Sequence, residues 1–262
     1  MKTSLVITTY NSPEALLLVL KSTQLQSHLP SEVIIADDGG NEDTKKAIDE
    51  FKKTSSLCLI HSWQEDKGFR AAQSRNKAIA KSTSDYIILI DGDMILHRDF
   101  IKDHIDHAED GFFVQGSRVL LTQSKTKKVL QQQKINFNFF NFGLKNRKNM
   151  INSKILSYLF SKKNNSLLGI KSCNMAFYKN DFININGFNN LFQGWGREDS
   201  EFVIRLMNNN IKRKTIRFNI IQFHLWHNEN TRKSIEFNDF LLKNSIDNKS
   251  KWCDDGFKKF NS

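Results

Sequence analysis

The chain has 262 residues, with 39 Lys or Arg against 28 Asp or Glu, and a formal net charge of +11. This length suffices for one large catalytic domain with a full hydrophobic core. The odd number and wide spacing of Cys58, Cys173 and Cys253 argue against a disulfide framework and favour a reducing compartment. No apolar run approaches membrane-spanning length, so we expect a cytoplasmic protein. The positive charge indicates an acidic partner, with nucleic acid, an anionic lipid surface and a phosphorylated substrate as candidates.

Short apolar runs alternate with helical patterns in the first half of the chain. Strands are predicted over Ser4–Thr9, Glu32–Asp37, Leu57–Ser62 and Tyr86–Asp91, and helices over Glu14–Leu25, Asp43–Lys53 and Arg70–Lys81. This alternation is typical of a parallel sheet covered by helices on both faces. Ligands of open α/β sheets bind at the carboxyl ends of strands. We therefore expect a binding site where Thr8–Asn11, Asp37–Gly40 and Asp91–Asp93 follow their strands.

The alternation is lost between residues 122 and 167, where Lys, Asn, Gln and Phe dominate. Aromatic and leucine side chains interrupt the basic residues, so the segment is not a purely disordered polar tail. We predict a variable basic insertion, suited to a membrane surface or an anionic acceptor, or else a solvated loop with a few buried anchors. It separates residues 1–121 from residues 168–262, which end in a charged C-terminal helical segment.

Asp91-Gly92-Asp93 places two carboxylates where a buried strand is expected to end. Hard oxygen ligands there suit Mg²⁺ or Mn²⁺, which usually share their coordination with substrate phosphates, although such triplets also occur as ordinary turns. His224 and His227 are further candidate ligands, because their spacing puts both imidazoles on one side of a helical turn. Imidazole beside carboxylate favours Mn²⁺ over Ca²⁺.

Basic residues accompany the predicted helix that begins at Arg70. Positive charge and backbone amides at a helix start suit a diphosphate, which makes Arg70 and Arg75 candidate contacts. Arg75 equally suits a second role, in which it pairs with a nearby aspartate and fastens the sheet. The chain has neither Gly-x-Gly-x-x-Gly after its first strand nor a Walker lysine loop, so it lacks the main devices of dinucleotide binding and ATP hydrolysis.

Residues 194 to 202 carry a second group of candidate residues. Two glycines bracket Trp195, and Glu198 and Asp199 open a predicted helix in which Phe202, Val203 and Leu206 share one face. Carboxylates at a helix N-terminus are stabilised by its free amides and dipole, and an indole ring can stack on a sugar. The pattern indicates a positioned base beside a binding platform, or else an acidic N-cap next to a core tryptophan.

Together these motifs resemble those of a known family. Val6-Ile7-Thr8-Thr9-Tyr10-Asn11, Asp37-Asp38-Gly39, the Arg75-Asn76 helix and Asp91-Gly92-Asp93 resemble the nucleotide-sugar half of glycosyltransferase family two, which has the GT-A fold. Gly194-Trp195-Gly196-Arg197-Glu198-Asp199 and His224-Leu225-Trp226-His227 are similar to the acceptor half of β-1,4-galactosyltransferases and bacterial chondroitin polymerases. The resemblance implies an α/β fold with a Rossmann-like mixed sheet, residues 1–121 as its nucleotide-sugar half and residues 168–262 as its acceptor-binding and catalytic half.

The resemblance also implies roles for individual residues. The implied donor-binding residues are Thr8, Tyr10, Asn11, Asp38, Arg70, Arg75, Asp91 and Asp93, with Thr8 and Asp38 on the uracil and ribose side of a UDP-sugar. Asp93 and His227 match metal ligands, while His224 stands where the galactosyltransferases have a methionine. Asp199 matches the catalytic base and Glu198 orients the sugar. Trp195, Gly196 and Arg197 belong to the acceptor platform, and Ser200 departs from the acid found at that place.

The implied activity is an inverting, metal-dependent transfer with Mn²⁺ or Mg²⁺ as cofactor. A sugar, with galactose or an N-acetylhexosamine favoured, moves from a UDP-sugar to a hydroxyl of a surface-glycan acceptor, oligosaccharide or lipid-linked, and a β-glycoside forms. The protein would work in the cytoplasm, with the inner face of the membrane as a candidate anionic surface. The alternatives are a nucleotidyltransferase, a silent nucleotide-sugar binder and, less favoured, a nucleic-acid-binding protein, which would leave Asp93 and Asp199 unexplained.

Overall fold

The computed structural model describes residues 1–228 and 231–260. Its first half consists of β1 (Thr3–Thr9), α1 (Pro13–Gln24), β2 (Glu32–Asp37), α2 (Glu42–Thr54), β3 (Leu59–Trp63), α3 (Ala71–Ala80) and β4 (Tyr86–Asp91). Every strand and helix predicted for this half is present, with each end within two residues of the expected one. The sequence pattern predicts this half well because the spacing of apolar residues differs between its strands and its helices.

The remaining elements are shorter. The middle of the chain contains β5 (Met94–Leu96), α4 (Phe100–His107), β6 (Phe112–Gln115), β7 (Val119–Leu121), α5 (Gln123–Gln132), β8 (Leu144–Lys145), the 3₁₀ helix η1 (Arg147–Met150), α6 (Lys154–Phe160) and β9 (Lys162–Asn164). The last part contains β10 (Asn174–Tyr178), α7 (Lys179–Asn184), α8 (Glu198–Asn208), β11 (Lys212–Thr215), β12 (Gln222–His224), α9 (Ile235–Asp247) and the 3₁₀ helix η2 (Phe257–Phe260).

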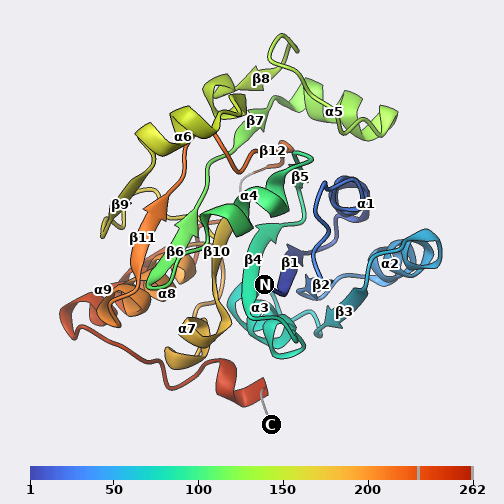
Figure 1. Ribbon diagram of the computed structural model, residues 1–262. Coiled ribbons are helices and arrows are strands. Elements are labelled where there is room, and N and C mark those ends of the chain that lie inside the picture. Colours follow the sequence, from blue (N-terminus) through green and yellow to red (C-terminus); the bar gives the residue numbers. More distant parts are fainter. Residues whose placement is uncertain (229–230, 261–262) are drawn as a thin grey trace.

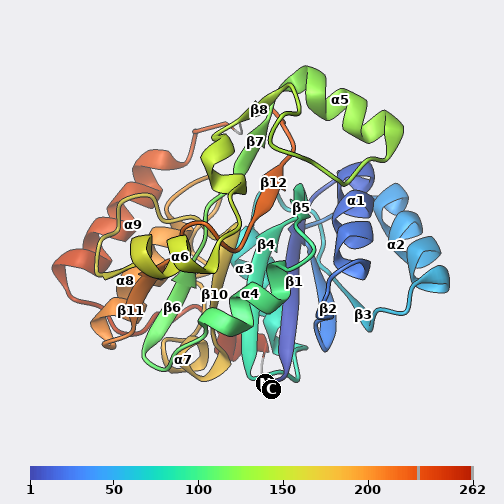
Figure 2. The same cartoon turned by 45° about the horizontal axis from the view of Figure 1, so that its top comes forward.

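Strand pairing within the described residues produces two sheets (Figure 1). The main sheet has eight strands in the order β3-β2-β1-β4-β10-β6-β11-β9, and the small sheet has four in the order β5-β12-β7-β8. Strands β1 to β4 are parallel, β10 runs antiparallel between β4 and β6, and β11 is parallel to β6. The mixed sheet expected from the sequence is confirmed. Figure 2 shows the small sheet and α5 on the side toward which β1 and β4 run.

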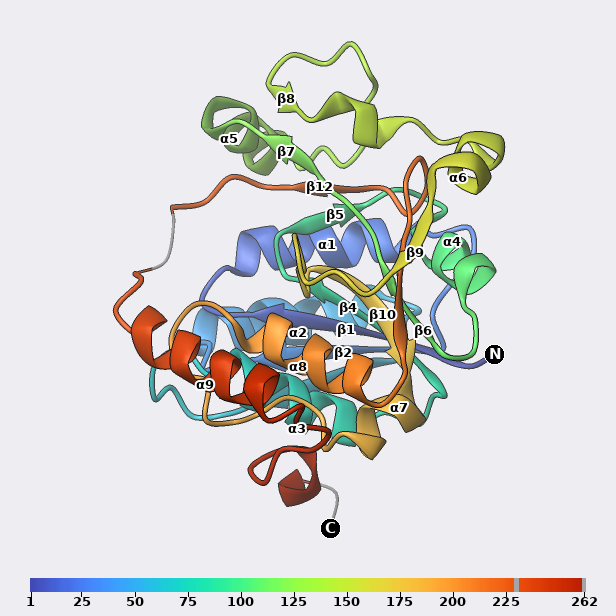
Figure 3. The same cartoon turned by 90° about the vertical axis from the view of Figure 1, so that its left-hand side faces the viewer.

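Helices cover both faces of the main sheet (Figure 3). Leu5 and Ile7 of β1 belong to the hydrophobic cluster with α1, α2 and α4, whereas Val6 between them belongs to the cluster with α3 and α8. Successive side chains of a strand point to opposite faces. A strand with apolar residues at consecutive positions is therefore stable only between two layers of helices, which explains why β1, β2 and β4 are central.

The segment of residues 122–167 is more regular than its composition indicates. It contains α5, β8, η1, α6 and β9, and its two strands extend the edges of the two sheets: β8 pairs with β7, and β9 pairs with β11. Val129 of α5 and Leu144 of β8 are buried against the small sheet. A few apolar anchors among many basic residues therefore suffice to hold this segment on the domain. Its identification as a variable insertion stays a prediction.

A buried ion pair fixes helix α8 in the domain. The guanidinium of Arg205 donates from Nε and Nη2 to the two carboxylate oxygens of Glu201, at 2.7 Å each. Its Nη1 donates to the carbonyl oxygens of Ile185 and Gly187, at 2.6 and 2.8 Å. Both charged side chains are almost fully inaccessible to solvent. A buried charge that loses its partner is strongly destabilising, so α8 depends on this pair for its position.

We predict that Arg205→Ala lowers the free energy of unfolding by about 3–5 kcal/mol, because Glu201 is left buried without its cation. Urea denaturation followed by circular dichroism measures the change. Lys102→Ala is the matched control, since Lys102 forms an exposed i,i+4 pair with Asp106 on α4 and should change stability little. Equal stability of the two variants would contradict the structural role of Arg205.

Candidate active site

The carboxyl ends of β1, β2 and β4 meet at one edge of the main sheet. Thr8 of β1 lies opposite Asp91 of β4, and Thr9 lies opposite Asp37 of β2. The backbone amide of Asp38 donates to the carbonyl oxygen of Thr9 at 3.0 Å. The three polar strand ends predicted from the sequence are therefore neighbours, because parallel strands end on the same side of a sheet.

Asp38 is buried at the β2 end of this edge. Its Oδ1 accepts a hydrogen bond from Nε2 of Gln64 at 2.5 Å, and its Oδ2 accepts one from the backbone amide of Arg70 at 2.6 Å. Burial raises the pKa of Asp38, and the hydrogen bonds from Arg70 and Gln64 counteract part of that shift. The carboxyl group is thus held in one orientation beside the start of α3.

Tyr10 and Asn11 form the rim of the site after β1. The hydroxyl of Tyr10 donates to Oδ2 of Asp66 at 2.9 Å, and this bond raises the pKa of the tyrosine. Oδ1 of Asn11 accepts the backbone amide of Asn41 at 2.9 Å, which ties the β1 loop to the N-cap of α2. About half of the Tyr10 side chain is exposed, so its ring is accessible next to Asp38.

Arg75 lies at the centre of the site, with only 4% of its side chain exposed. Its Nε donates to Oγ1 of Thr8 at 3.1 Å, its Nη2 lies 3.3 Å from Oδ1 of Asp91, and its Nη1 lies 3.2 Å from Oε1 of Glu198. The sequence left two roles open for Arg75, contact with a diphosphate and pairing with an aspartate that fastens the sheet. The pair with Asp91 corresponds to the second role. The other basic candidate, Arg70, donates from Nη1 to Gln73 at 2.8 Å at the start of α3.

Asp93, His224 and His227 converge just beyond the end of β4. The Nε2 atoms of His224 and His227 lie 3.1 and 3.2 Å from Oδ2 of Asp93. The prediction that both imidazoles share a helical turn is wrong: His224 ends β12, and His227 lies in the following loop. Antiparallel pairing places His224 opposite Met94, the residue after Asp93, so sheet register brings these groups together.

The residues of this cluster fit a divalent cation. Their candidate ligand atoms all lie within 4.8 Å of one another. Oδ1 of Asp93 is buried and has no hydrogen-bond partner among the described residues. Nδ1 of His227 lies 2.7 Å from the carbonyl oxygen of Asn228, an arrangement that directs Nε2 toward the carboxylate. One carboxylate with two imidazoles suits Mn²⁺ and related ions.

The loop before α8 brings two adjacent acids to the same edge. Glu198 is the first residue of α8 and pairs with Arg75, as described above. Oδ1 of Asp199 accepts the backbone amide of Ser200 at 2.7 Å. Burial, followed by the negative charge of Glu198, raises the pKa of Asp199 to about 7. The two carboxyl groups thus have different surroundings although they are neighbours in the chain: Glu198 contacts the guanidinium of Arg75, and Asp199 is buried.

Helix α9 holds this loop in place. Nδ2 of Asn238 donates to the carbonyl oxygens of Gln193 and Gly196, at 3.1 and 2.9 Å, and Arg197 pairs with Asp239. A Cβ at Gly194, whose φ is +72°, would lie 2.4 Å from Oγ of Ser234. The indole ring of Trp195 is 42% exposed and lies 5.3 Å from the guanidinium of Arg232. The predicted platform residues are therefore accessible at the rim of the site.

Sequence reasoning missed two residues that act on this site. Asn238 is a buried polar residue inside a helix, and Arg118 lies just before β7. Burial opposes the charge of Arg118, but Cys173 and then the acidic groups of Asp91 and Asp93 raise its pKa. Neither residue belongs to a motif, so only their tertiary surroundings identify them.

Comparison with known proteins adds to this geometry. The family model described as glycosyl transferase family 2 matches residues 4–182, and the model described as the N-terminal domain of galactosyltransferase matches residues 157–228. Hyaluronan synthase of Pasteurella multocida is 27% identical over 224 residues, which are 78% of this chain and 22% of that protein. Chondroitin synthase of Escherichia coli is 24% identical over 231 residues, 78% of this chain and 32% of that protein. The chain thus spans less than a third of these relatives.

Solved structures share the fold. S. aureus TarS 1–349 in complex with UDP has a TM-score of 0.62 and 15% identity, over 94% of this chain and 65% of that one. The mannosyltransferase PcManGT from Pyrobaculum calidifontis, in complex with GDP-Man and Mn²⁺, has a TM-score of 0.58 and 15% identity, over 86% and 56%. These likenesses confirm the GT-A fold class expected from the sequence.

We predict that Asp199→Asn gains stability relative to the wild type as the pH rises. A folded-state pKa near 7 lies above the ordinary value of aspartate, so the wild type loses stability between about pH 4 and 7 as this buried group ionises. Between pH 5 and 8.5 the difference in free energy of unfolding should change by on the order of 1–3 kcal/mol. Urea denaturation at several pH values measures it.

Asp49→Asn is the control for this prediction, because Asp49 lies on the exposed face of α2. The difference between this control and the wild type should be constant with pH. If the Asp199→Asn difference were constant as well, the raised pKa of Asp199 would be refuted.

Proposed function

The chain belongs to glycosyl transferase family 2, and on this premise we propose that it is an inverting, metal-dependent enzyme that transfers a sugar from a UDP-sugar to a hydroxyl of a glycan. The observation that carries the proposal is the meeting of two groups of residues at one sheet edge. The cluster of Asp93, His224 and His227 and the pair Glu198 and Asp199 are linked through Asp91 and Arg75.

The donor site extends from β2 to β4 along this edge. Asp38 and Thr8 contact the nucleoside, and the exposed ring of Tyr10, on a loop fixed by Asn11, covers the base. Arg70 supplies positive charge near the diphosphate. The complexes of TarS with UDP and with UDP-GlcNAc support a UDP-sugar donor. We favour galactose or an N-acetylhexosamine as its sugar.

Asp93, His224 and His227 hold Mn²⁺ or Mg²⁺ in this proposal. When bound, the cation neutralises the negative charge of the departing diphosphate. The buried oxygen of Asp93 without a partner supports this role, and the Mn²⁺ complex of PcManGT is consistent with it. Asp91 pairs with Arg75 and ends β4 two residues before Asp93, and in this proposal it faces the ribose and diphosphate.

Asp199 acts as the general base toward the acceptor hydroxyl. A base needs a pKa near the operating pH, and the raised pKa of Asp199 meets this requirement. Glu198, fixed by Arg75, orients the sugar, while Trp195, Gly196 and Arg197 form the acceptor platform. The hydroxyl oxygen attacks the anomeric carbon from the face opposite the diphosphate, its proton passes to Asp199, and the bond to the diphosphate breaks. An α-linked donor thereby gives a β-glycoside.

Release of UDP from a panel of UDP-sugars, with and without Mn²⁺, tests the function. One donor should give metal-dependent release, and Asp93→Ala should abolish it. Asp199→Asn should bind UDP and Mn²⁺ like the wild type in calorimetry but lose about 10²–10⁴-fold in transfer, because only proton removal is affected. Asp49→Ala, on the exposed face of α2, is the control and should behave as the wild type.

Two results would contradict this scheme. Retained transfer in Asp199→Asn would exclude that residue as the base. Metal-independent UDP binding, equal in the wild type and Asp93→Ala, would exclude the metal site. Formation of a nucleotide-sugar from a sugar phosphate would instead identify a nucleotidyltransferase, and binding without turnover of any donor and acceptor would identify a silent binder.

The acceptor in this proposal is a surface glycan, and the enzyme works in the cytoplasm at the inner face of the membrane. None of the described helices is long and apolar enough to cross a bilayer. Phe142 and Tyr158 are 90% and 87% exposed, and Phe140 and Leu168 are nearly as accessible. The exposed lysines of the same segment include Lys145, Lys148 and Lys154. Exposed aromatic rings beside lysines are suited to an anionic lipid surface.

We predict that the protein sediments with vesicles containing phosphatidylglycerol and that raised salt weakens this association. Phe140→Ser combined with Phe142→Ser should lower the bound fraction about tenfold, because two rings no longer enter the lipid interface. Leu25→Ser, at an exposed leucine after α1, is the control. Equal binding of the double variant and this control would exclude the segment as a membrane contact.

A further inference from the structure

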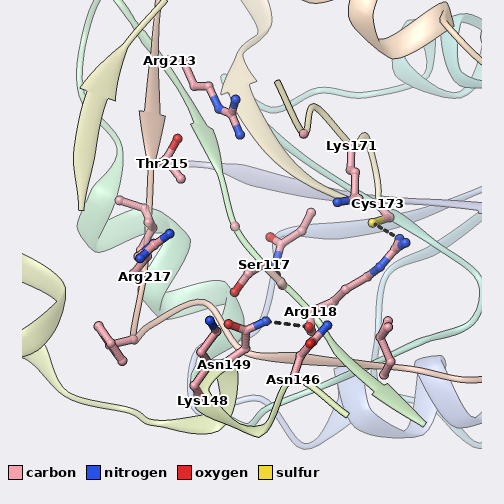
Figure 4. Close-up of a pocket in the computed structure, with 16 residues that line it drawn as sticks. Ser117, Arg118, Asn146, Lys148, Asn149, Lys171, Cys173, Arg213, Thr215 and Arg217 are labelled. Atoms are coloured by element: carbon pink, nitrogen blue, oxygen red, sulfur yellow. Dashed lines mark hydrogen bonds between the residues drawn. The ribbon is translucent and has the colours of Figure 1, made fainter. Parts of the chain in front are cut away.

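A second hollow lies beside the candidate active site, at the carboxyl ends of β6 and β11. It is a cavity of about 310 Å³ between these strand ends, the start of β7 and η1. Figure 4 shows its lining side chains, which come from segments that are far apart in the sequence. The basic ones are Arg118, Lys148, Lys171, Arg213 and Arg217.

The described side chains that line the cavity carry positive charge and no negative charge. Among the described residues that line it, none is acidic. Within residues 1–228 and 231–260, none of its five basic side chains forms an ion pair. Cations gathered in a hollow repel one another unless an anion is bound. The arrangement therefore favours a negatively charged ligand.

Arg213 shows that the cavity is built into the fold and is not only a group of surface lysines. Just 6% of this residue is exposed. Its Nη1 donates to the carbonyl oxygens of Ser166 and Leu168, at 3.0 and 2.8 Å, which fixes the guanidinium. Its Nε is buried without a hydrogen-bond partner, as is Oγ1 of Thr215 on the same strand. Figure 4 shows the Arg213 side chain reaching from β11 toward the other labelled residues.

Buried polar groups without partners are rare, because each one costs the free energy of its lost hydration. Burial lowers the pKa of Arg213, and the structure places no acidic partner among the described residues beside its guanidinium. Arg213 and Thr215 are two residues apart on a strand, so their side chains lie on the same face. An anion between them would satisfy both orphaned groups and restore the lost electrostatic stabilisation.

The cavity is next to the reaction centre. Nη1 of Arg118 lies 3.0 Å from Sγ of Cys173, and both groups are close enough to Asp91 and Asp93 for their pKa values to respond to these acids. Leu120, also in the lining, is paired with His224 across β7 and β12. In the sheet order, β4 and β10 separate the donor strands β1 and β2 from β6 and β11. The cavity therefore lies on the side opposite the nucleoside.

We propose that this cavity binds an oxyanion, a phosphate or a carboxylate, that belongs to the acceptor glycan. The proposal rests on the function proposed above, because the donor then occupies the β1 to β4 edge and leaves this side to the acceptor. Phosphate and carboxylate both present negatively charged oxygen atoms that accept hydrogen bonds from guanidinium and hydroxyl groups. This is the chemistry that the cavity recognises. The preferred acceptor is accordingly an anionic glycan, with a uronate or a phosphodiester near the accepting sugar.

Calorimetry tests the site apart from catalysis. With the donor site saturated by UDP and Mg²⁺, inorganic phosphate or glucuronate is titrated into the protein, and glucose serves as the neutral probe. We expect binding of at least one anion and none of glucose. Lys171→Ala combined with Arg217→Ala should weaken that binding at least tenfold, because two donors of charge-assisted hydrogen bonds are lost. Both side chains are exposed, so this variant should fold.

Arg213→Gln is a second variant, which removes the buried charge and should abolish anion binding. Lys162→Ala is the matched control, because Lys162 is an exposed lysine of β9 outside the cavity. The control should keep the anion affinity of the wild type. Absence of anion binding in the wild type, or equal binding in the control and the double variant, would overturn the inference.

Transfer rates distinguish the two sources of the anion. Acceptor oligosaccharides that differ only in a uronate, a phosphate or a neutral sugar are compared at saturating donor. The double variant should raise KM about tenfold for one anionic acceptor and change kcat little. Equal KM values for neutral and anionic acceptors would refute the inference while leaving the transferase intact. Absence of UDP binding to the wild type would instead refute the proposed function. Failure of the inference can therefore be distinguished from failure of the proposed function.

Discussion

The buried guanidinium of Arg75 is the contact on which the candidate site depends. It joins Thr8 of β1, Asp91 of β4 and Glu198 of α8, three elements that come from distant parts of the chain. A buried cation is destabilising unless it is paired and hydrogen-bonded. The fold therefore brings α8 against the strand ends in the one position that pairs this charge. The distance between the histidine cluster and the acids of α8 is fixed as a result.

The same contact gives two neighbouring acids different properties. Glu198 faces Arg75, whereas Asp199 is buried beside the negative charge of Glu198 and has the amide and hydroxyl of Ser200 as hydrogen-bond donors. In the function proposed above, this difference in surroundings is the reason why the proton-accepting role is assigned to Asp199. One arginine thus positions the helix and distinguishes the surroundings of its first two acidic residues.

Local sequence patterns predict the parts of this site that directly follow strongly apolar strands. The polar ends of β1, β2 and β4 follow apolar runs, so Thr8, Asp38 and Asp91 are identifiable from periodicity. The spacing of His224 and His227 predicts a pair but places it on a helical turn, because the register of β12 against β5 is a tertiary contact that no local period contains. Arg118 and Arg213 gave no signal for the same reason: their surroundings are formed by strands far apart in the sequence.

The distribution of charge along the sheet edge connects the proposed cation site with the proposed anion site in the basic cavity. The edge at the ends of β1, β2 and β4 is acidic, with Arg75 already paired, and the carboxyl groups along it belong to Asp38, Asp91, Asp93, Glu198 and Asp199. A diphosphate placed there is repelled unless a divalent ion lies between it and Asp93. The cavity at the ends of β6 and β11 has the opposite charge, because the described residues that line it include basic side chains and no acidic ones. If the two proposals hold, an anionic acceptor is attracted to that cavity rather than to the cation beside the donor, and the strand order keeps the two negatively charged substrates in separate places.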